Sequence, residues 1–199
     1  MIALAHTFNK EKDNVDGYWV QPKLDGIRAT FDGEQLLTRT GKTIHAPAEW
    51  LDRLRGLVEH TGETIDGELV TSSMLNEWFW RDEDEEFRLG HNFNDLASVV
   101  RSKKADDRWD EVWFYAFDTV EDSKEIYSNR YELLWSYPDS GNYPTFIAPV
   151  LQVITDGYND VGEELKEDAA KNNLEGYILR NPRAVYQRKR TRDLSLIHI

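Results

Sequence analysis

A lysine near the amino terminus lies in a stretch whose residue types could carry out covalent phosphate chemistry. Residues 23–28 read Lys-Leu-Asp-Gly-Ile-Arg, so Lys23 and Arg28 flank Gly26. Glycine permits a tight turn or a positive φ, which would let both cations converge on one ligand from either side of a bend. Nearby cations or desolvation lower the pKa of an amine enough for attack on phosphorus, and Arg28 is such a cation. Taken alone, the stretch also fits an ordinary Asp-Gly hairpin turn.

Four later stretches, in order along the chain, place charged or aromatic groups beside turns and at strand ends. They are residues 38–41 with Arg39, residues 65–69 with Asp66 and Glu68, residues 113–118 with Phe117, and residues 175–180 with Glu175 and Arg180. An ordered set of this kind is far more specific than any one member. The set therefore favours a phosphate site over an isolated turn.

In their order, these stretches resemble the motifs of the covalent nucleotidyltransferases, the superfamily of ATP-dependent polynucleotide ligases and messenger-RNA capping enzymes. The resemblance extends from about Ala3 to Arg192. Capping enzymes usually have Asp-Gly where this chain has Glu175 and a glycine, and they rarely close that motif with an arginine such as Arg180. These two residues favour a DNA ligase, and residues 21–28 most resemble the small ligases of bacteriophages.

The resemblance implies that Lys23 attacks the α-phosphate of ATP, releases pyrophosphate and holds AMP through a phosphoramidate bond. AMP would then pass to a 5′-phosphate, and the adjacent 3′-hydroxyl would close a nick in duplex DNA. Glu175 is the expected ligand of Mg²⁺ or Mn²⁺, with Asp66 and Glu68 assisting at the metal or the ribose, because a hard ion prefers oxygen ligands.

Further nucleotide contacts are expected around that reaction. Arg28 and Arg39 would offset developing phosphate charge, which makes Arg28 a catalytic residue beside Lys23. Phe117 is expected to stack on adenine, and its alternative role is core packing. The full set of expected nucleotide contacts is Gln21, Lys23, Arg28, Arg39, Glu68, Phe117, Arg180 and Arg190.

The overall charge of the chain is unfavourable for binding DNA, because the net charge is −13 and the pI is about 4.8. Acidic residues concentrate in blocks at 82–86 and 163–168, whereas residues 101–104 and 180–192 are locally basic. Phosphate contacts come from lysine and arginine, so the basic patches are the expected DNA surfaces. The predicted DNA contacts are Arg101, Lys103 and Lys104, and a solvated charged face is an equal alternative.

Length and composition fit one domain inside a cell. The chain has 199 residues, within the usual range for a single domain, and no cysteines, which excludes disulfides and thiolate chemistry. Residues 1–8 are too short and too weakly apolar for a signal peptide, and no later run has the length of a membrane span. We expect a monomer in a bacterial or phage-infected cytoplasm, with ATP and nicked DNA as partners.

The pattern of apolar runs predicts an α+β fold of mostly antiparallel sheets with flanking helices. Strands are predicted at residues 17–22, 27–31, 35–38, 68–71, 112–117 and 177–179, and helices at residues 48–59, 93–103, 129–135 and 160–172. Pro22 cannot donate a ladder hydrogen bond, so Lys23 should lie near a strand end or an edge. The predicted core includes Trp78, Phe79, Trp80, Trp109 and Trp113. The resemblance implies two sheets around a nucleotide cleft, a nucleotidyltransferase fold similar to ATP-grasp.

The carboxyl end departs from the family pattern. Residues 194–199 read Leu-Ser-Leu-Ile-His-Ile, which matches the translation of a transposase sequencing adapter, so the adenylation domain is expected to occupy residues 1–193. Family ligases continue there into a motif with two lysines and then a small oligonucleotide-binding barrel. We therefore expect this fragment to adenylylate slowly or not at all. The open alternatives are a capping guanylyltransferase, an RNA ligase, and a non-catalytic nucleotide- or DNA-binding module.

Overall fold

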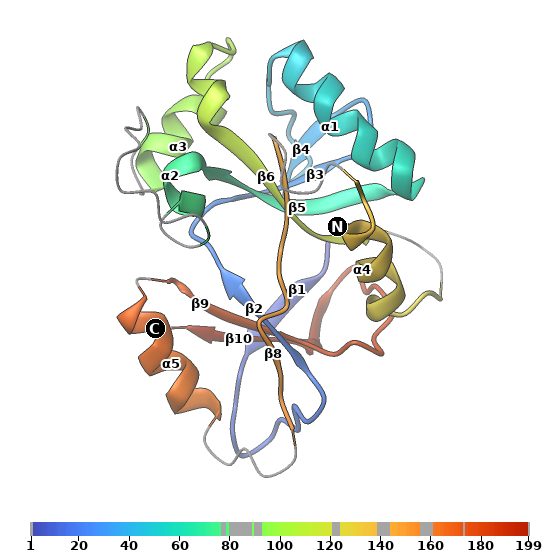
Figure 1. Cartoon of the computed structure of the whole chain (residues 1–199), viewed down its shortest axis with the longest axis vertical. Helices are drawn as coiled ribbons and strands as arrows, with labels where there is room; N and C mark the ends of the chain where they lie inside the picture. The colour runs from blue at the N-terminus through green and yellow to red at the C-terminus, as the bar shows by residue number, and fades with distance from the viewer. Residues whose placement is uncertain are drawn as a thin grey trace. The chain divides into compact units, whose positions relative to one another are not determined.

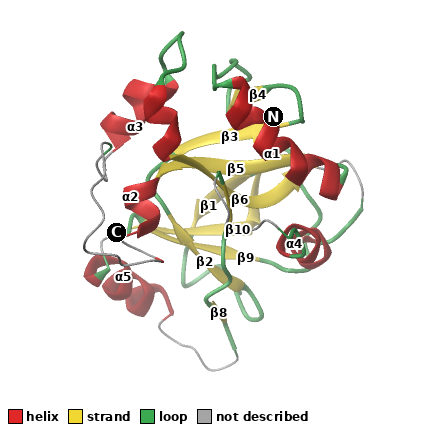
Figure 2. Cartoon of the chain, turned by 45° about the horizontal axis from the view of Figure 1, so that its top comes forward, coloured by secondary structure: helices red, strands yellow, loops and turns green. Residues whose placement is uncertain are grey.

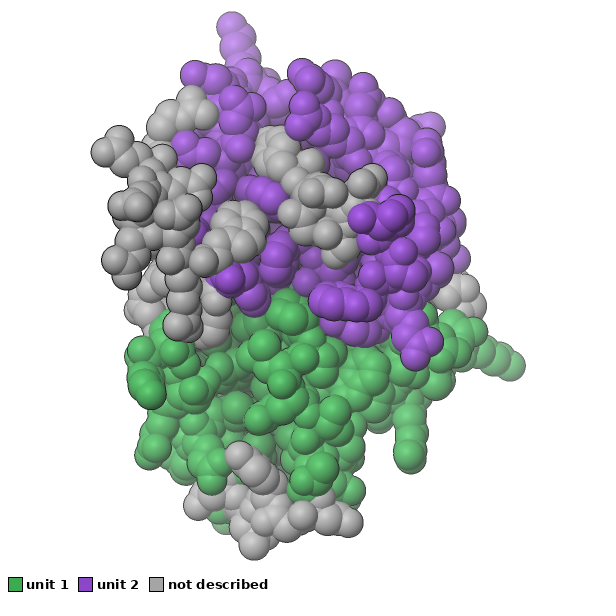
Figure 3. All heavy atoms as spheres, in the orientation of Figure 1, with its two compact units in different colours: residues 1–24, 122–130, 148–199 green, residues 25–121, 131–147 purple. Residues whose placement is uncertain are grey.

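The chain folds into two compact units, each assembled from stretches that are distant in sequence. The computed structural model describes residues 2–76, 79, 89, 93–120, 124–138, 144–155, 161–172 and 174–198. Unit 1 comprises residues 1–24, 122–130 and 148–199, and unit 2 comprises residues 25–121 and 131–147 (Figure 3). Each unit contains its own five-stranded sheet.

The sheet of unit 1 has the strand order β1-β10-β9-β2-β8 (Figure 1). The strands are β1 (Leu4–Thr7), β2 (Trp19–Lys23), β8 (Gln152–Val153), β9 (Gly176–Arg180) and β10 (Arg190–His198). β1 pairs with β10 in parallel, whereas the other three pairings are antiparallel. Helix α5 (Val161–Lys171) packs against β9 and β10. Its apolar positions, including Leu165 and Ala169, repeat at helical spacing and are buried.

The sheet of unit 2 has the order β4-β3-β5-β6-β7. Figure 2 labels the first four of these strands. Its strands are β3 (Ile27–Phe31), β4 (Leu36–Thr38), β5 (Thr64–Thr71), β6 (Val112–Val120) and β7 (Thr145–Ile147). Along the chain, the described helical elements between β4 and β6 are α1 (Ala48–Thr61), α2 (Ser72–Leu75), α3 (Phe93–Val100) and the 3₁₀ helix η2 (Asp107–Glu111). The boundary between the units falls within α4 (Tyr127–Trp135).

Strand β6 is buried at all nine positions and belongs to the unit 2 core. A strand covered on both faces is expected to be continuously apolar, and residues 112–117 are. Trp109 and Trp113 are buried as predicted, and the half-buried Phe79 ring lies 4.6 Å from that of Phe146. Trp78 and Trp80 lie outside the described residues.

The α+β prediction is confirmed, and six of the eight described strand pairings are antiparallel. Strand β3 has its predicted bounds, whereas β5 begins four residues before the prediction and β6 ends three residues after it. The predicted helix at residues 93–103 ends at Val100, because the polar residues that follow offer no apolar face. No helix within the described residues has the length and apolar character needed to cross a membrane.

Tyr177 joins β9 to α5 through a part-buried hydrogen bond. Its hydroxyl donates to Asp168 Oδ2, and the residue is 2% exposed. Burial, and then the hydrogen bond and charge of Asp168, raise the pKa of Tyr177 above its ordinary value. Tyr177→Phe should lower the free energy of unfolding by about 1–2 kcal/mol, measured by urea denaturation at neutral pH.

The pH dependence of that difference follows from the sign of the shift. Because the pKa of Tyr177 is higher in the folded state than in the unfolded state, the tyrosine contributes its full stabilisation of the fold below the ordinary tyrosine pKa. This contribution to the free energy of unfolding is lost as the pH rises through the folded-state pKa. The stability gap between the unaltered chain and Tyr177→Phe should therefore be constant up to about pH 10 and narrow above it. A gap that widens in alkali would contradict this assignment.

Candidate active site

Unit 1 brings Lys23 and Glu175 together although 152 positions separate them in sequence. Lys23 is the last residue of β2 and pairs with Gly176 at the start of β9, so the residue before β9 reaches the lysine. The Lys23 Nζ donates to Glu175 Oε2. The two side chains are 28% and 24% exposed, so the pair is partly desolvated and still accessible.

The position of Lys23 at a strand end agrees with the expectation from Pro22. β8 pairs with β2 only at Trp19 and Val20, so its short ladder does not extend to Pro22. Among the described strands, β9 is the one that continues along β2 to Lys23. The lysine therefore lies where the β2–β8 ladder has already ended.

Arg28 in unit 2 is held by a buried carboxylate. Its Nε donates to Asp66 Oδ1 and its Nη2 to Asp66 Oδ2, each at 2.7 Å. Asp66 is fully buried and the Arg28 side chain is 24% exposed, so the buried carboxylate fixes the orientation of the guanidinium through two hydrogen bonds. In the β3–β5 ladder, Arg28 also lies opposite Glu68. This arrangement gives Asp66 a clear orienting role, whereas its predicted assistance at a metal or ribose stays a prediction.

Phe117 lies at an irregularity in the β5–β6 ladder. Asp66 pairs with Asp118 and Gly67 pairs with Ala116, which leaves Phe117 as the extra residue of a β-bulge. Bulges redirect side chains and are frequent next to active sites. The Arg28 guanidinium carbon lies 4.5 Å from the Phe117 ring centroid, a cation–π contact.

A cavity of about 610 Å³ in unit 2 joins residues from three of the predicted stretches. Arg28, Arg39 and Glu68 line it, together with the predicted DNA contact Arg101. Its volume lies within the range of small-molecule sites, and its three arginines make it suited to anions. The cavity thus gathers four of the predicted residues within one unit.

Gly26 also lines this cavity, but for a reason that the sequence did not predict. Its φ is not positive. A Cβ at this position would lie 2.3 Å from the Leu69 carbonyl oxygen and 2.6 Å from Glu68 Cγ. Glycine is required here because the turn approaches the backbone of β5 closely.

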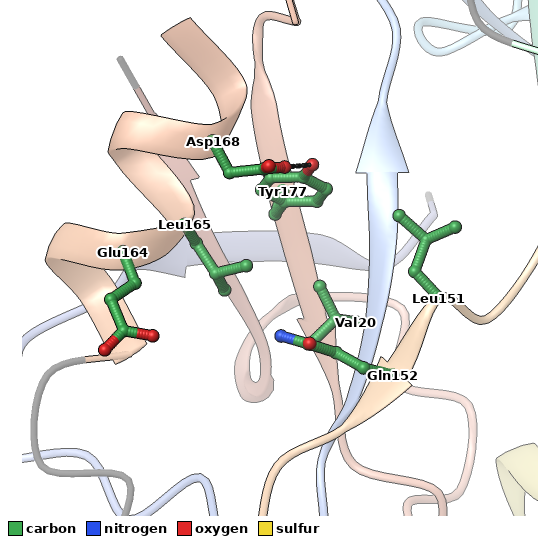
Figure 4. A pocket seen from close by; sticks show the side chains of 7 residues that line it. All are labelled: Val20, Leu151, Gln152, Glu164, Leu165, Asp168 and Tyr177. Atoms are coloured by element: carbon green, nitrogen blue, oxygen red, sulfur yellow. Dashed lines mark hydrogen bonds between the residues drawn. The ribbon is translucent and has the colours of Figure 1, made fainter. Parts of the chain in front are cut away.

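A second cavity, of about 370 Å³, lies between α5 and the sheet of unit 1 (Figure 4). Tyr177 and Asp168 meet at one end of it, and Val20 and Gln152 lie at the other. Alternate residues of a strand face opposite sides of a sheet, so Val20 and Lys23 belong to opposite faces of β2. The described lining residues include none of the predicted site residues.

The other predicted residues lie elsewhere. Arg190 is exposed on β10 and donates to the Ala5 carbonyl. Lys103 and Lys104 are exposed in the turn after α3. Gln21 and Arg180 are buried in unit 1. Their predicted ligand contacts stay predictions.

Comparison with known proteins decides the family. The model of the ATP dependent DNA ligase domain matches residues 2–196. The chain belongs to this family. The DNA ligase of Haemophilus influenzae is 27% identical over 198 residues, which cover 97% of this chain and 61% of that protein. The ligase domain described here thus spans less than two thirds of that relative.

Solved structures share the fold of this ligase domain. A Lig E DNA ligase is 27% identical with a TM-score of 0.72, and the match covers 100% of this chain and 68% of that one. The Chlorella virus DNA ligase-adenylate has a TM-score of 0.65 at 24% identity, covering 100% and 67%. The bacteriophage T7 ligase in complex with ATP has a TM-score of 0.64 at 16% identity, covering 99% and 68%.

Two residues of this ligase domain that line the cavity of unit 2 were not identified as site residues from the sequence. Lys42 and His45 line the 610 Å³ cavity beside Arg39. The Thr38 amide donates to the Lys42 carbonyl at 2.8 Å, which closes the turn and brings Lys42 beside Arg39. A lysine three residues after Arg39, across a Thr-Gly turn, was the available signal.

Proposed function

We propose that this chain carries out the adenylation step of a DNA ligase, in which Lys23 takes AMP from ATP for transfer to a 5′-phosphate at a DNA nick. The observation that carries the proposal is the Lys23–Glu175 pair, partly exposed at the ends of adjacent strands in a chain of the ligase family. The Lys23 ammonium would first release a proton to solvent, and the neutral amine would then form a bond to the α-phosphorus while the bond to pyrophosphate breaks, leaving a phosphoramidate. The nick's 5′-phosphate oxygen would then displace the amine.

Arg28 and Arg39 supply positive charge for the phosphates in this proposal. Arg28 cannot rotate freely, because Asp66 accepts from two of its nitrogens. Pre-oriented donors stabilise developing charge without reorganising during the reaction. Arg39 is exposed in the turn after β4 and lines the same cavity, so it can reach an incoming anion.

The available carboxylates suit a hard divalent cation. Glu175 is partly exposed, and one of its oxygens already accepts from a cationic amine. Glu68 is half-buried at the 610 Å³ cavity. We assign the metal to Glu175, since Mg²⁺ needs only one or two protein carboxylates. The predicted assistance of Glu68 at the metal or the ribose stays a prediction. When bound, such an ion neutralises charge on the reacting phosphates.

Phe117 is the proposed stacking partner of adenine. The bulge at Phe117 supports this role because it frees the ring from the regular alternation of β6. A stacked ring contributes dispersion energy but distinguishes purines poorly. Selection of ATP over GTP must therefore come from polar contacts to the base edge.

The experiment is incubation of the chain with ATP labelled at the α-phosphate and with Mg²⁺ or Mn²⁺, followed by denaturing electrophoresis. We expect a slowly formed covalent label that acid releases, as for a phosphoramidate, and that passes to a 5′-phosphate when nicked DNA is added. Labelling by GTP alone would favour a capping enzyme. Transfer only to nicked RNA would favour an RNA ligase, and no label with either metal would contradict adenylation by this chain.

Arg101 is the proposed DNA contact within unit 2. It follows α3, lines the 610 Å³ cavity and lies 5.5 Å from the Phe93 ring centroid. Arg101→Ala should weaken binding of nicked DNA by about three- to tenfold and lower the slope of log affinity against log salt by about one. Lys166→Ala is the matched control, because Lys166 is exposed on α5 of unit 1 and pairs with Glu163. Equal effects of the two variants would reject a specific role for Arg101.

A further inference from the structure

Tyr127 of α4 contacts both strands of unit 1 that hold the Lys23–Glu175 pair. On the β2 side, its hydroxyl donates to Gln21 Oε1 at 3.0 Å. Gln21 Nε2 in turn donates to the Ala148 carbonyl at 3.1 Å. Gln21 and Tyr127 are each 2% exposed. The Gln21 side chain is therefore enclosed, with both ends of its amide in hydrogen bonds.

On the β9 side, the ring of Tyr127 packs against Arg180. The Arg180 guanidinium carbon lies 4.6 Å from the ring centroid, and Arg180 is 5% exposed. Trp19 pairs with Arg180 across the ladder, and its ring meets Tyr127 edge to face at 5.7 Å. One tyrosine thus links β2 through a hydrogen bond and β9 through a cation–π contact.

This contact lies on the face of the sheet that carries Lys23. Residues two apart on a strand share a face, so Gln21 and Lys23 do. Cross-strand partners also share a face, which places Gly176 with Lys23 and Arg180 with Trp19 on that side. Tyr127 therefore contacts β2 two residues from the nucleophile, roughly 7 Å along the strand, and contacts β9 at Arg180, four residues from the partner of Lys23.

We propose that Gln21, Tyr127 and Arg180 form a clamp that positions Lys23 against Glu175, with Gln21 a positioning residue and not a contact of the base. The proposal rests on the adenylation function above. An enclosed side chain with both amide ends engaged offers no surface to a purine. Loosening the clamp lets β2 shift against β9, and the Lys23 amine then loses its alignment with the α-phosphorus.

The test measures the rate of self-adenylylation against ATP concentration. Tyr127→Phe keeps the ring contacts and removes the hydroxyl, so the maximal rate should fall about tenfold while half-saturating ATP changes less than about twofold. Gln21→Met should act in the same direction. The double variant should be no slower than the slower single variant, because both break the same hydrogen bond.

Tyr177→Phe is the matched control. It also removes a hydroxyl from a 2% exposed tyrosine in unit 1, but on the α5 face of β9. It should lower stability and leave the maximal rate unchanged. If it slows adenylylation as much as Tyr127→Phe, the effect is general loosening and the clamp is rejected. A higher half-saturating ATP with an unchanged rate in Gln21→Met would make Gln21 a nucleotide contact and also reject it.

A measurement without ATP separates this inference from the adenylation proposal. If the unaltered chain forms no adduct with ATP, the adenylation proposal is rejected. The clamp is then tested by acetylating Lys23 with an amine-reactive ester and measuring the extent of acetylation by peptide mass spectrometry. Tyr127→Phe should raise Lys23 acetylation about threefold relative to Lys166, because a loosened strand end opens more often. An unchanged ratio would overturn the clamp.

Discussion

Replacing Lys23 by alanine should abolish covalent labelling by ATP. The rate should fall on the order of 10⁴-fold or more, as expected when the nucleophile is removed from a set of residues that act together. Lys23→Arg is the sharper variant. It keeps a cation facing Glu175, but a guanidinium stays protonated and does not attack phosphorus. Both variants should be unlabelled, measured by electrophoresis after incubation with labelled ATP and Mg²⁺.

Controls separate the loss of the nucleophile from the loss of the fold. Lys166→Ala removes an exposed lysine of unit 1 and should label normally. Thermal unfolding should show that Lys23→Arg is nearly as stable as the unaltered chain, because the guanidinium keeps a cation beside the partly exposed Glu175. Substantial labelling of Lys23→Arg would mean that another residue carries AMP.

Gly26→Ala should damage both stability and activity. Its Cβ would meet the Leu69 carbonyl oxygen at 2.3 Å, and a backbone oxygen can withdraw only if the β3–β5 ladder shifts. We expect the free energy of unfolding to fall by about 2–4 kcal/mol, as for other forced backbone displacements in a packed region. Adenylylation should fall about 100-fold, because Arg28 and Glu68 move with that ladder.

Gly17→Ala is the matched control for Gly26. Gly17 has a φ of +75°, but no atom of the described residues lies within 4 Å of its added Cβ. The substitution therefore carries only the conformational strain of a left-handed residue, about 1 kcal/mol. Urea denaturation compares the two variants directly. A Gly26→Ala protein as stable as Gly17→Ala would show that the turn has room beside β5.

Local patterns in the sequence predicted much of the secondary structure. The strand at Ile27–Phe31 was predicted to the residue, because its alternating apolar residues are bounded by glycine turns at both ends. β10 was missed, since its sequence begins with charged residues and its partner β1 lies at the other end of the chain. Its residues 194–198 pair with β9, and their origin in a sequencing adapter stays a prediction.

Within the site, sequence motifs predicted which residues matter better than what each one contacts. The order of the motifs pointed to Lys23 and Glu175, and the structure pairs them. Nothing in the sequence distinguishes a carboxylate that binds metal from one that orients an arginine, so the burial of Asp66 beneath Arg28 was unforeseen. Tyr127 was also unforeseen, because one of nine tyrosines carries no local sign of a role between strands.

The most direct test of the central claim is peptide mass spectrometry of the unaltered chain after incubation with ATP and Mg²⁺. If the β2 lysine captures AMP, the spectrum should show one added adenylyl group, located on Lys23. Treatment with acid should remove this group. An adenylyl group on any other residue, or none after the chain has bound ATP, would contradict the assignment of Lys23 as the nucleophile.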